Sequence, residues 1–105
     1  MDLSQFELHD ANLLGVSLDS VARTVEVRLA YYPSGHMQDC VLAVLSFSGV
    51  TRFNQITDLA LLEEHAKFGN VSQFVTGEQP GVSYLYLARG LIEIVAASVA
   101  FSTKA

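Results

Sequence analysis

The chain has 105 residues and a mass of 11.4 kDa, and half of its residues are apolar, so it can form one domain around a single core. Eleven acidic and six basic side chains give a formal net charge of −5 with neutral histidines, which disfavours binding to nucleic-acid phosphates. The single cysteine, Cys40, excludes an intramolecular disulfide and a zinc site built from several thiolates.

A β-hairpin is predicted over Asn12 to Tyr32, because two apolar alternations meet across a short polar connection. Asp19 and Ser20 are residue types that suit the turn between them. The side chains expected to face inward are Leu14, Val16 and Leu18 on the first strand, and Val25, Val27, Leu29 and Tyr31 on the second.

The segment Pro33 to His36 ends this pattern in a turn, and another strand is predicted from about Asp39 to Phe47. Both alternating sets of side chains in that strand are largely apolar. We therefore expect it in the middle of the sheet, with both faces covered. Cys40 is then expected to be a small buried side chain and not a nucleophile.

The period of the apolar residues changes to helical spacing over Asp58 to Phe68. Thr57 or Asp58 can cap the start of this helix, and Gly69-Asn70 can adopt the positive φ that ends one. A helix this short is only marginally stable in isolation, and we therefore expect it to pack on the sheet.

Three more strands are predicted: Val71 to Val75, Val82 to Ala88, and Leu91 to about Ser102. A tight reversal at Arg89-Gly90, with glycine free to adopt positive φ, joins the last two. Alanines in the middle of the last segment leave a helical interpretation open there. The sequence contains no visible internal repeat, low-complexity segment or linker.

These elements predict an α+β protein that is mainly β. We expect an antiparallel sheet or sandwich of six or seven short strands with one helix packed on it, in a single domain over residues 1–105. The apolar stretch from Ile94 to Phe101 is about ten residues too short to span a bilayer as a helix. The first ten residues lack the basic start and apolar run of a secretory signal, so we expect a cytoplasmic protein.

His9 and Asp10 are the first candidates for chemistry, because a neighbouring imidazole and carboxylate can act as a pair. Adjacent residues of an extended strand point to opposite sides, so we favour hydrogen bonding to nearby backbone for both. His36 and Cys40 lie in a loop, where their spacing does not predict a metal site, and His65 is expected at the edge of the core. No cofactor or metal is expected.

Glu63 and Glu64 are candidate contacts for a basic protein partner, because they lie on the polar face of the predicted helix. Tyr84 and Tyr86 share one face of their strand. That face is core if it packs under the helix, which we favour, and a binding surface if it is exposed.

The segment Phe6-Glu7-Leu8-His9-Asp10-Ala11-Asn12-Leu13 resembles the start of a group of small, mostly uncharacterised bacterial proteins. Their motif is Phe-x-x-His-Asp-Ala/Ser-x-Leu, in which His9 and Asp10 match the central pair. Some of these proteins are grouped with immunity proteins, which bind and neutralise a cognate toxin inside the cell. The resemblance covers about the first 30 residues and implies no catalytic role for the pair.

Three functions follow, in order of preference. The first is a non-catalytic, immunity-type domain that neutralises a basic protein by surface complementarity. The second is a homo-oligomeric assembly protein, in which the apolar strand from Leu91 to Phe101 pairs or packs across subunits. The third is a small enzyme that uses His9 and Asp10, and a small-ligand pocket between sheet and helix is a further alternative.

Overall fold

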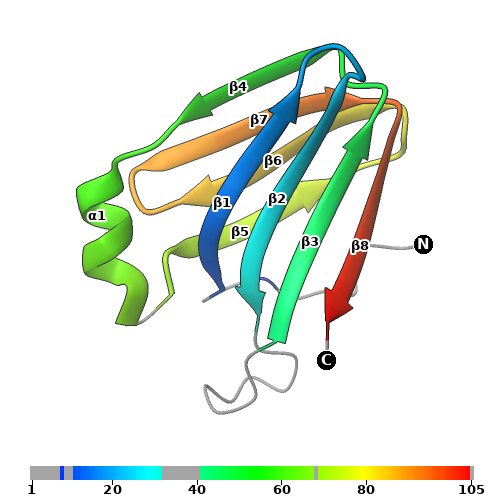
Figure 1. The fold of residues 1–105 in the computed structure, drawn as a ribbon. Coiled ribbons are helices and arrows are strands. Elements are labelled where there is room, and N and C mark those ends of the chain that lie inside the picture. The colour runs from blue at the N-terminus through cyan, green and yellow to red at the C-terminus, as the bar shows by residue number, and fades with distance from the viewer. Residues whose placement is uncertain (1–7, 9–10, 32–40, 68, 105) are drawn as a thin grey trace.

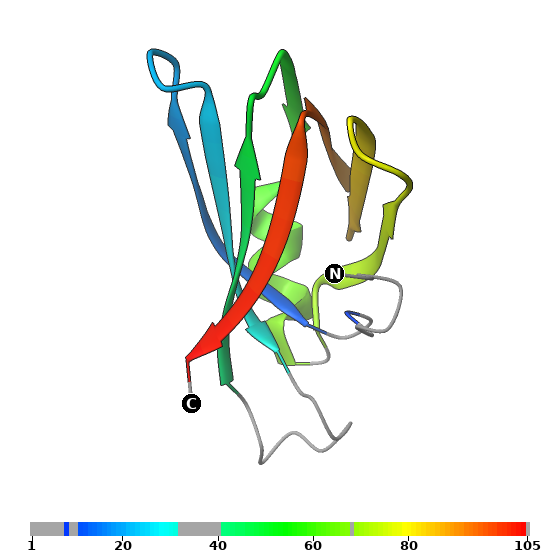
Figure 2. The same ribbon diagram turned by 90° about the vertical axis from the view of Figure 1, so that its right-hand side faces the viewer.

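The chain folds into two four-stranded antiparallel sheets that face each other, as the computed structural model shows for residues 8, 11–31, 41–67 and 69–104. Sheet A has the order β1 (Asn12–Asp19), β2 (Thr24–Tyr31), β3 (Val41–Ser48) and β8 (Ser98–Lys104). Sheet B has the order β4 (Arg52–Ile56), β7 (Gly90–Ala96), β6 (Gly81–Leu87) and β5 (Val71–Thr76). In Figure 1 the strands of one sheet cross those of the other at an angle, and Figure 2 shows the two layers from the side. The predicted class, α+β and mainly β, is confirmed, with eight strands in place of six or seven.

The two halves of the chain repeat one route through the sandwich. Strands β1, β2 and β3 lie in sheet A and β4 crosses to sheet B, whereas β5, β6 and β7 lie in sheet B and β8 crosses to sheet A. Each half also has a register irregularity near the start of its first strand, between Leu13 and Gly15 and between Val71 and Gln73. The fold therefore contains an internal repeat of topology that the sequence did not reveal.

The two crossings lie side by side at one end of the sandwich. The Ala97 N–H donates to the carbonyls of Ser48, at 2.9 Å, and of Gly49, at 3.1 Å. Gly49 has φ +62°, and a Cβ atom there would lie 2.7 Å from the Cβ of Ala97. The long strand predicted from Leu91 to about Ser102 is thus wrong in one respect, because the chain changes sheets at Ala97 and forms two strands.

The core fills the space between the sheets and contains the inner faces of both. The predicted inward residues Val25, Val27 and Leu29 of β2 are buried, but Leu14 and Leu18 of β1 are each 54% exposed. Val16 packs against the core as predicted, and the irregularity after Leu13 places Leu13 against the core in place of Leu14. Leu18 borders a shallow hollow at the hairpin end of the sandwich.

Strand β3 lies between β2 and β8, as its two apolar sets predict, and buries Ala43, Leu45 and Phe47. The expected cover on its other face is absent among the residues that the structure describes. Leu42 on that face is 53% exposed, and Val44 is half-buried. The outer face of sheet A is therefore a surface.

The helix is shorter than the spacing of apolar residues over Asp58 to Phe68 predicts: α1 spans Leu59–Glu64 and is followed by a 3-10 turn over His65–Lys67. Asp58 caps it, as its Oδ1 accepts from the Leu61 N–H at 3.1 Å, and Gly69 has the expected positive φ. Leu62 joins the core, but His65 is exposed and not at the core edge as predicted. The helix lies beside the sandwich and does not cover the outer face of either sheet (Figure 1).

The reversal between β6 and β7 also differs from its prediction. Arg89, and not Gly90, has the positive φ of this turn, at 53°. Gly90 is needed for another reason, because a Cβ atom there would lie 2.5 Å from the Ile56 carbonyl oxygen of the neighbouring strand β4.

Candidate functional site

The outer face of sheet B carries a continuous group of apolar and aromatic side chains. On β6 and β7 the inner positions are buried, and the alternate positions of the four strands point away from sheet A. The pairing registers place the outward residues in rows across the sheet. We call the following set the sheet B face: Arg52, Asn54, Ile56, Gln73, Val75, Val82, Tyr84, Tyr86, Leu91, Glu93 and Val95.

Tyr84 and Tyr86 lie at the centre of the sheet B face. Their rings are stacked, with centroids 6.0 Å apart and an interplanar angle of 24°. Tyr86 is 40% exposed, and Ile56, two strands away in the same row across the sheet, is 68% exposed. The preferred prediction, that these tyrosines form core under the helix, is wrong, because α1 lies at the side of the sandwich. The alternative, an exposed tyrosine face, is what the structure contains.

The sheet B face has few charges. Glu93 is half-buried and accepts a hydrogen bond from Asn54 Nδ2 to Oε1 at 2.8 Å, across the β4–β7 pair. Arg52 lies on the same strand as Asn54 and is exposed. The two formal charges cancel, so this face does not share the acidic excess of the whole chain.

The outer face of sheet A is more polar and provides a contrast. Glu26 and Arg28 project from its second strand and are exposed. The Arg28 guanidinium donates from Nη1 to Ser17 Oγ at 2.7 Å and lies over Gly15, where an added Cβ would clash with it. Charged and hydroxyl groups thus occupy positions that tyrosines and aliphatic side chains occupy on sheet B.

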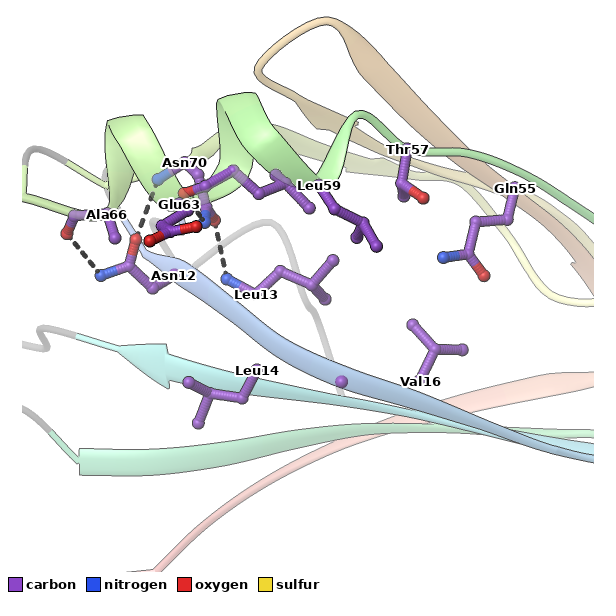
Figure 3. A pocket seen from close by; sticks show the side chains of 12 residues that line it. Asn12, Leu13, Leu14, Val16, Gln55, Thr57, Leu59, Glu63, Ala66 and Asn70 are labelled. Carbon is purple, nitrogen blue, oxygen red and sulfur yellow. Dashed lines mark hydrogen bonds between the residues drawn. The ribbon is translucent and has the colours of Figure 1, made fainter.

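A hollow of about 500 Å³ lies between β1, the end of β4 and α1. Leu13 and Leu59 point into it, Gln55 and Thr57 line one end, and Glu63 lines the other (Figure 3). Its volume is within the range of small-ligand sites, but only the carboxylate of Glu63 supplies a charge among its lining residues. No pair of acids or acid–base pair converges on this hollow among the residues described, so its geometry does not indicate catalysis.

Two asparagines close one end of this hollow. Asn70 is 5% exposed; its Oδ1 accepts from the Leu13 N–H at 2.8 Å and its Nδ2 donates to the Leu62 carbonyl at 2.9 Å. Asn12 Oδ1 accepts from the Asn70 N–H at 3.0 Å. Because the side-chain amides of Asn12 and Asn70 are engaged in these hydrogen bonds, both have a structural role. The sequence indicated Asn70 only as a helix end and did not reveal this contact, which joins distant parts of the chain.

Glu63 and Glu64, the predicted partner contacts, are both exposed on α1 and lie outside the sheet B face. Neither carboxylate makes an ion pair or hydrogen bond with another described residue. Glu63 and Glu64 are therefore neighbours on one helix, but they do not form a common site with Tyr84 and Tyr86.

His9, Asp10, His36 and Cys40 lie outside the described residues. Their described neighbours in the N-terminal motif are structural: Leu8 and Ala11 are buried, the Ala11 N–H donates to the Leu8 carbonyl, and the Ala11 carbonyl accepts from the Val71 N–H. Within residues 8, 11–31, 41–67 and 69–104, no group of three or more His, Cys, Asp or Glu side chains could hold a metal ion.

Comparison with protein-family models, with curated proteins and with solved structures gave no match for this chain. Over the described residues, the search for a helix with the length and hydropathy of a membrane span found none.

Proposed function

We propose that this protein is a non-catalytic protein-binding domain and that the sheet B face is its contact surface. The observation that carries the proposal is the stacked pair Tyr84 and Tyr86, which lies among aliphatic side chains on a sheet face that α1 leaves open. Tyrosine is enriched in protein interfaces because it combines a large apolar ring with a hydroxyl group and has few rotatable bonds. Apolar side chains gathered on one face mark interaction sites more often than scattered ones do.

A basic protein is the partner that the charge of the chain favours. The formal net charge of −5 attracts a cation-rich surface over several ångströms, and Glu63 and Glu64 add a negative region on α1. The resemblance of the N-terminal motif to immunity-type proteins agrees with this proposal. According to this proposal, Glu63 and Glu64 on α1 accelerate association with the partner, and the sheet B face forms the interface of the stable complex.

The second candidate is a homo-oligomer, and a specific feature supports it. The second half of the predicted apolar segment Leu91 to Phe101 forms β8 of sheet A, whereas β7 is paired on both sides within sheet B. A second copy could pack against the outer face of sheet A, where Leu42 is 53% exposed. A solution mass at a multiple of 11.4 kDa that falls in Leu42→Lys would favour this candidate.

Capture of a partner from a lysate of the source cells, with three versions of the full chain, tests the proposal. Wild type is compared with Tyr86→Lys, on the sheet B face, and with Leu42→Lys, a similarly exposed apolar site on sheet A. We expect Tyr86→Lys to reduce recovery of the partner about tenfold or more, and Leu42→Lys to leave it unchanged. Equal recovery with Tyr86→Lys would refute the assignment of this face, provided that thermal unfolding shows all three chains folded.

A further inference from the structure

One carboxylate on the sheet B face has no cation beside it among the described residues. Glu93 lies on β7 between Asn54 of β4 and Tyr84 of β6, which are its cross-strand neighbours. Its one hydrogen-bonding partner among the described side chains is the neutral amide of Asn54, at 2.8 Å. A protein that covered this face without supplying a positive group would bury a charge uncompensated, which is strongly unfavourable.

The aromatic neighbours of Glu93 favour a particular kind of cation. Side chains directly opposite on paired strands have Cβ atoms about 5 Å apart, which places Tyr84 beside Glu93 on this face of the sheet. The stack with Tyr86 extends this aromatic surface along β6. The face of a tyrosine ring attracts a cation, and a planar guanidinium can stack on it while donating to a carboxylate.

The chain's own basic residue on this face does not supply the missing charge. Arg52 is paired with Val95, two positions along β7 from Glu93, and forms no ion pair with it in the structure. Within the part of the chain that the structure describes, the sheet B face therefore offers an acceptor and an aromatic surface at one place, without a cation between them.

We infer that Glu93, Tyr84 and Asn54 form a recognition site for an arginine side chain of the protein partner. The guanidinium donates to the Glu93 carboxylate and stacks on Tyr84, and Asn54 holds the carboxylate in position. Arginine fits better than lysine because its flat group can make both contacts together, whereas an ammonium is a compact point charge. This inference rests on the proposed function, to which it adds the chemistry of the partner.

The test uses the 15N-labelled full chain and two peptides, acetyl-Val-Arg-Val-amide and its neutral analogue with citrulline in place of arginine. The amide resonances of Tyr84, Tyr86 and Glu93 are followed during titration at low salt. We expect the arginine peptide to shift these resonances and to bind about tenfold more tightly than the citrulline peptide.

Variants separate the site from general attraction to an acidic protein. Glu93→Gln keeps an oxygen for the Asn54 hydrogen bond but removes the charge, and we expect it to weaken binding of the arginine peptide about tenfold. Tyr84→Phe keeps the ring and should bind normally, whereas Tyr84→Leu should bind weakly. Glu26→Gln is the matched control, because Glu26 is an exposed strand carboxylate of sheet A paired with Ser17 and Ser46.

Unchanged affinity in Glu93→Gln, equal binding of the two peptides, or shifts confined to other faces would overturn the arginine site. These outcomes are distinct from failure of the proposed function. If capture of the partner still depends on Tyr86 while Glu93→Gln has no effect, the contact surface stands and the arginine site is wrong. If capture does not depend on Tyr86, the contact surface itself is wrong.

Discussion

The side chains of Asn12 and Asn70 accept hydrogen bonds from backbone N–H groups at the start of each other's strands, although the two residues are 58 positions apart in the sequence. Asn12 Oδ1 accepts from the Asn70 N–H at the start of β5, and Asn70 Oδ1 accepts from the Leu13 N–H at the start of β1. Each Nδ2 then donates to a carbonyl of the helical segment, Asn12 to Ala66 and Asn70 to Leu62. Two equivalent positions of the repeated topology thus join both sheets and the helix.

We predict that Asn70→Ala lowers the free energy of unfolding by about 3 kcal/mol, because it leaves the Leu13 N–H and the Leu62 carbonyl without their partners. Urea denaturation measures the change. Ser72→Ala, at an exposed position two residues later, is the control and should stay within about 0.5 kcal/mol of wild type. An equally small effect of Asn70→Ala would show that this junction does not stabilise the fold.

Two glycines should respond oppositely to alanine. A Cβ atom at Gly90 would lie 2.5 Å from the Ile56 carbonyl oxygen, so Gly90→Ala must separate β7 from β4 and should destabilise the protein by about 1–3 kcal/mol. A methyl group at Gly77 would have no other atom within 4 Å, and Gly77→Ala should be neutral or slightly stabilising. Thermal unfolding of both variants checks the contrast, and similar melting temperatures would contradict it.

Arg89 adopts φ 53° in the turn between β6 and β7, a conformation that is unfavourable for residues with a Cβ. Arg89→Gly removes this strain and should stabilise the protein by about 1 kcal/mol, although the more flexible unfolded chain offsets part of the gain. Arg89→Val should have the opposite sign, because a branched side chain tolerates positive φ least. Loss of stability in Arg89→Gly, measured by urea denaturation, would contradict the explanation.

The acids on α1 should affect how fast the partner binds more than how long it stays. We predict that the double change Glu63→Lys with Glu64→Lys slows association with the captured partner about tenfold at low salt and has a smaller effect at high salt. Surface-plasmon-resonance measurements at two ionic strengths separate the rates. If association and dissociation both remain as in wild type, Glu63 and Glu64 are not partner contacts of any kind.

Local patterns predicted the elements of this fold well. The period-two alternation of Val25, Val27 and Leu29 correctly identified the inner face of β2, and Asp58 correctly marked the start of α1. Such features depend on residues close in the sequence. The division of the last segment at Ala97 depends instead on hydrogen bonds to Ser48 and Gly49, which no local pattern contains.

The candidate site was harder to predict than the fold, and β6 shows why. Its inner set, Ser83, Leu85 and Leu87, is no more apolar than its outer set, Val82, Tyr84 and Tyr86. Alternation alone could not decide which set faced the core, and the assumption of a covering helix led to the wrong choice. Asn70 was missed for a related reason, since its burial depends on Leu13 and Asn12 from a distant part of the chain.

Cross-saturation NMR on the labelled chain in complex with its unlabelled partner tests the sheet B face as the contact surface, because it reports which residues the partner touches. We predict that saturation transfers to the sheet B face, with the strongest effects around Tyr84, Tyr86 and Glu93, and little on the outer face of sheet A. Transfer centred on Leu42 and Val44 of sheet A, or on the hollow beside Leu59, would contradict this prediction.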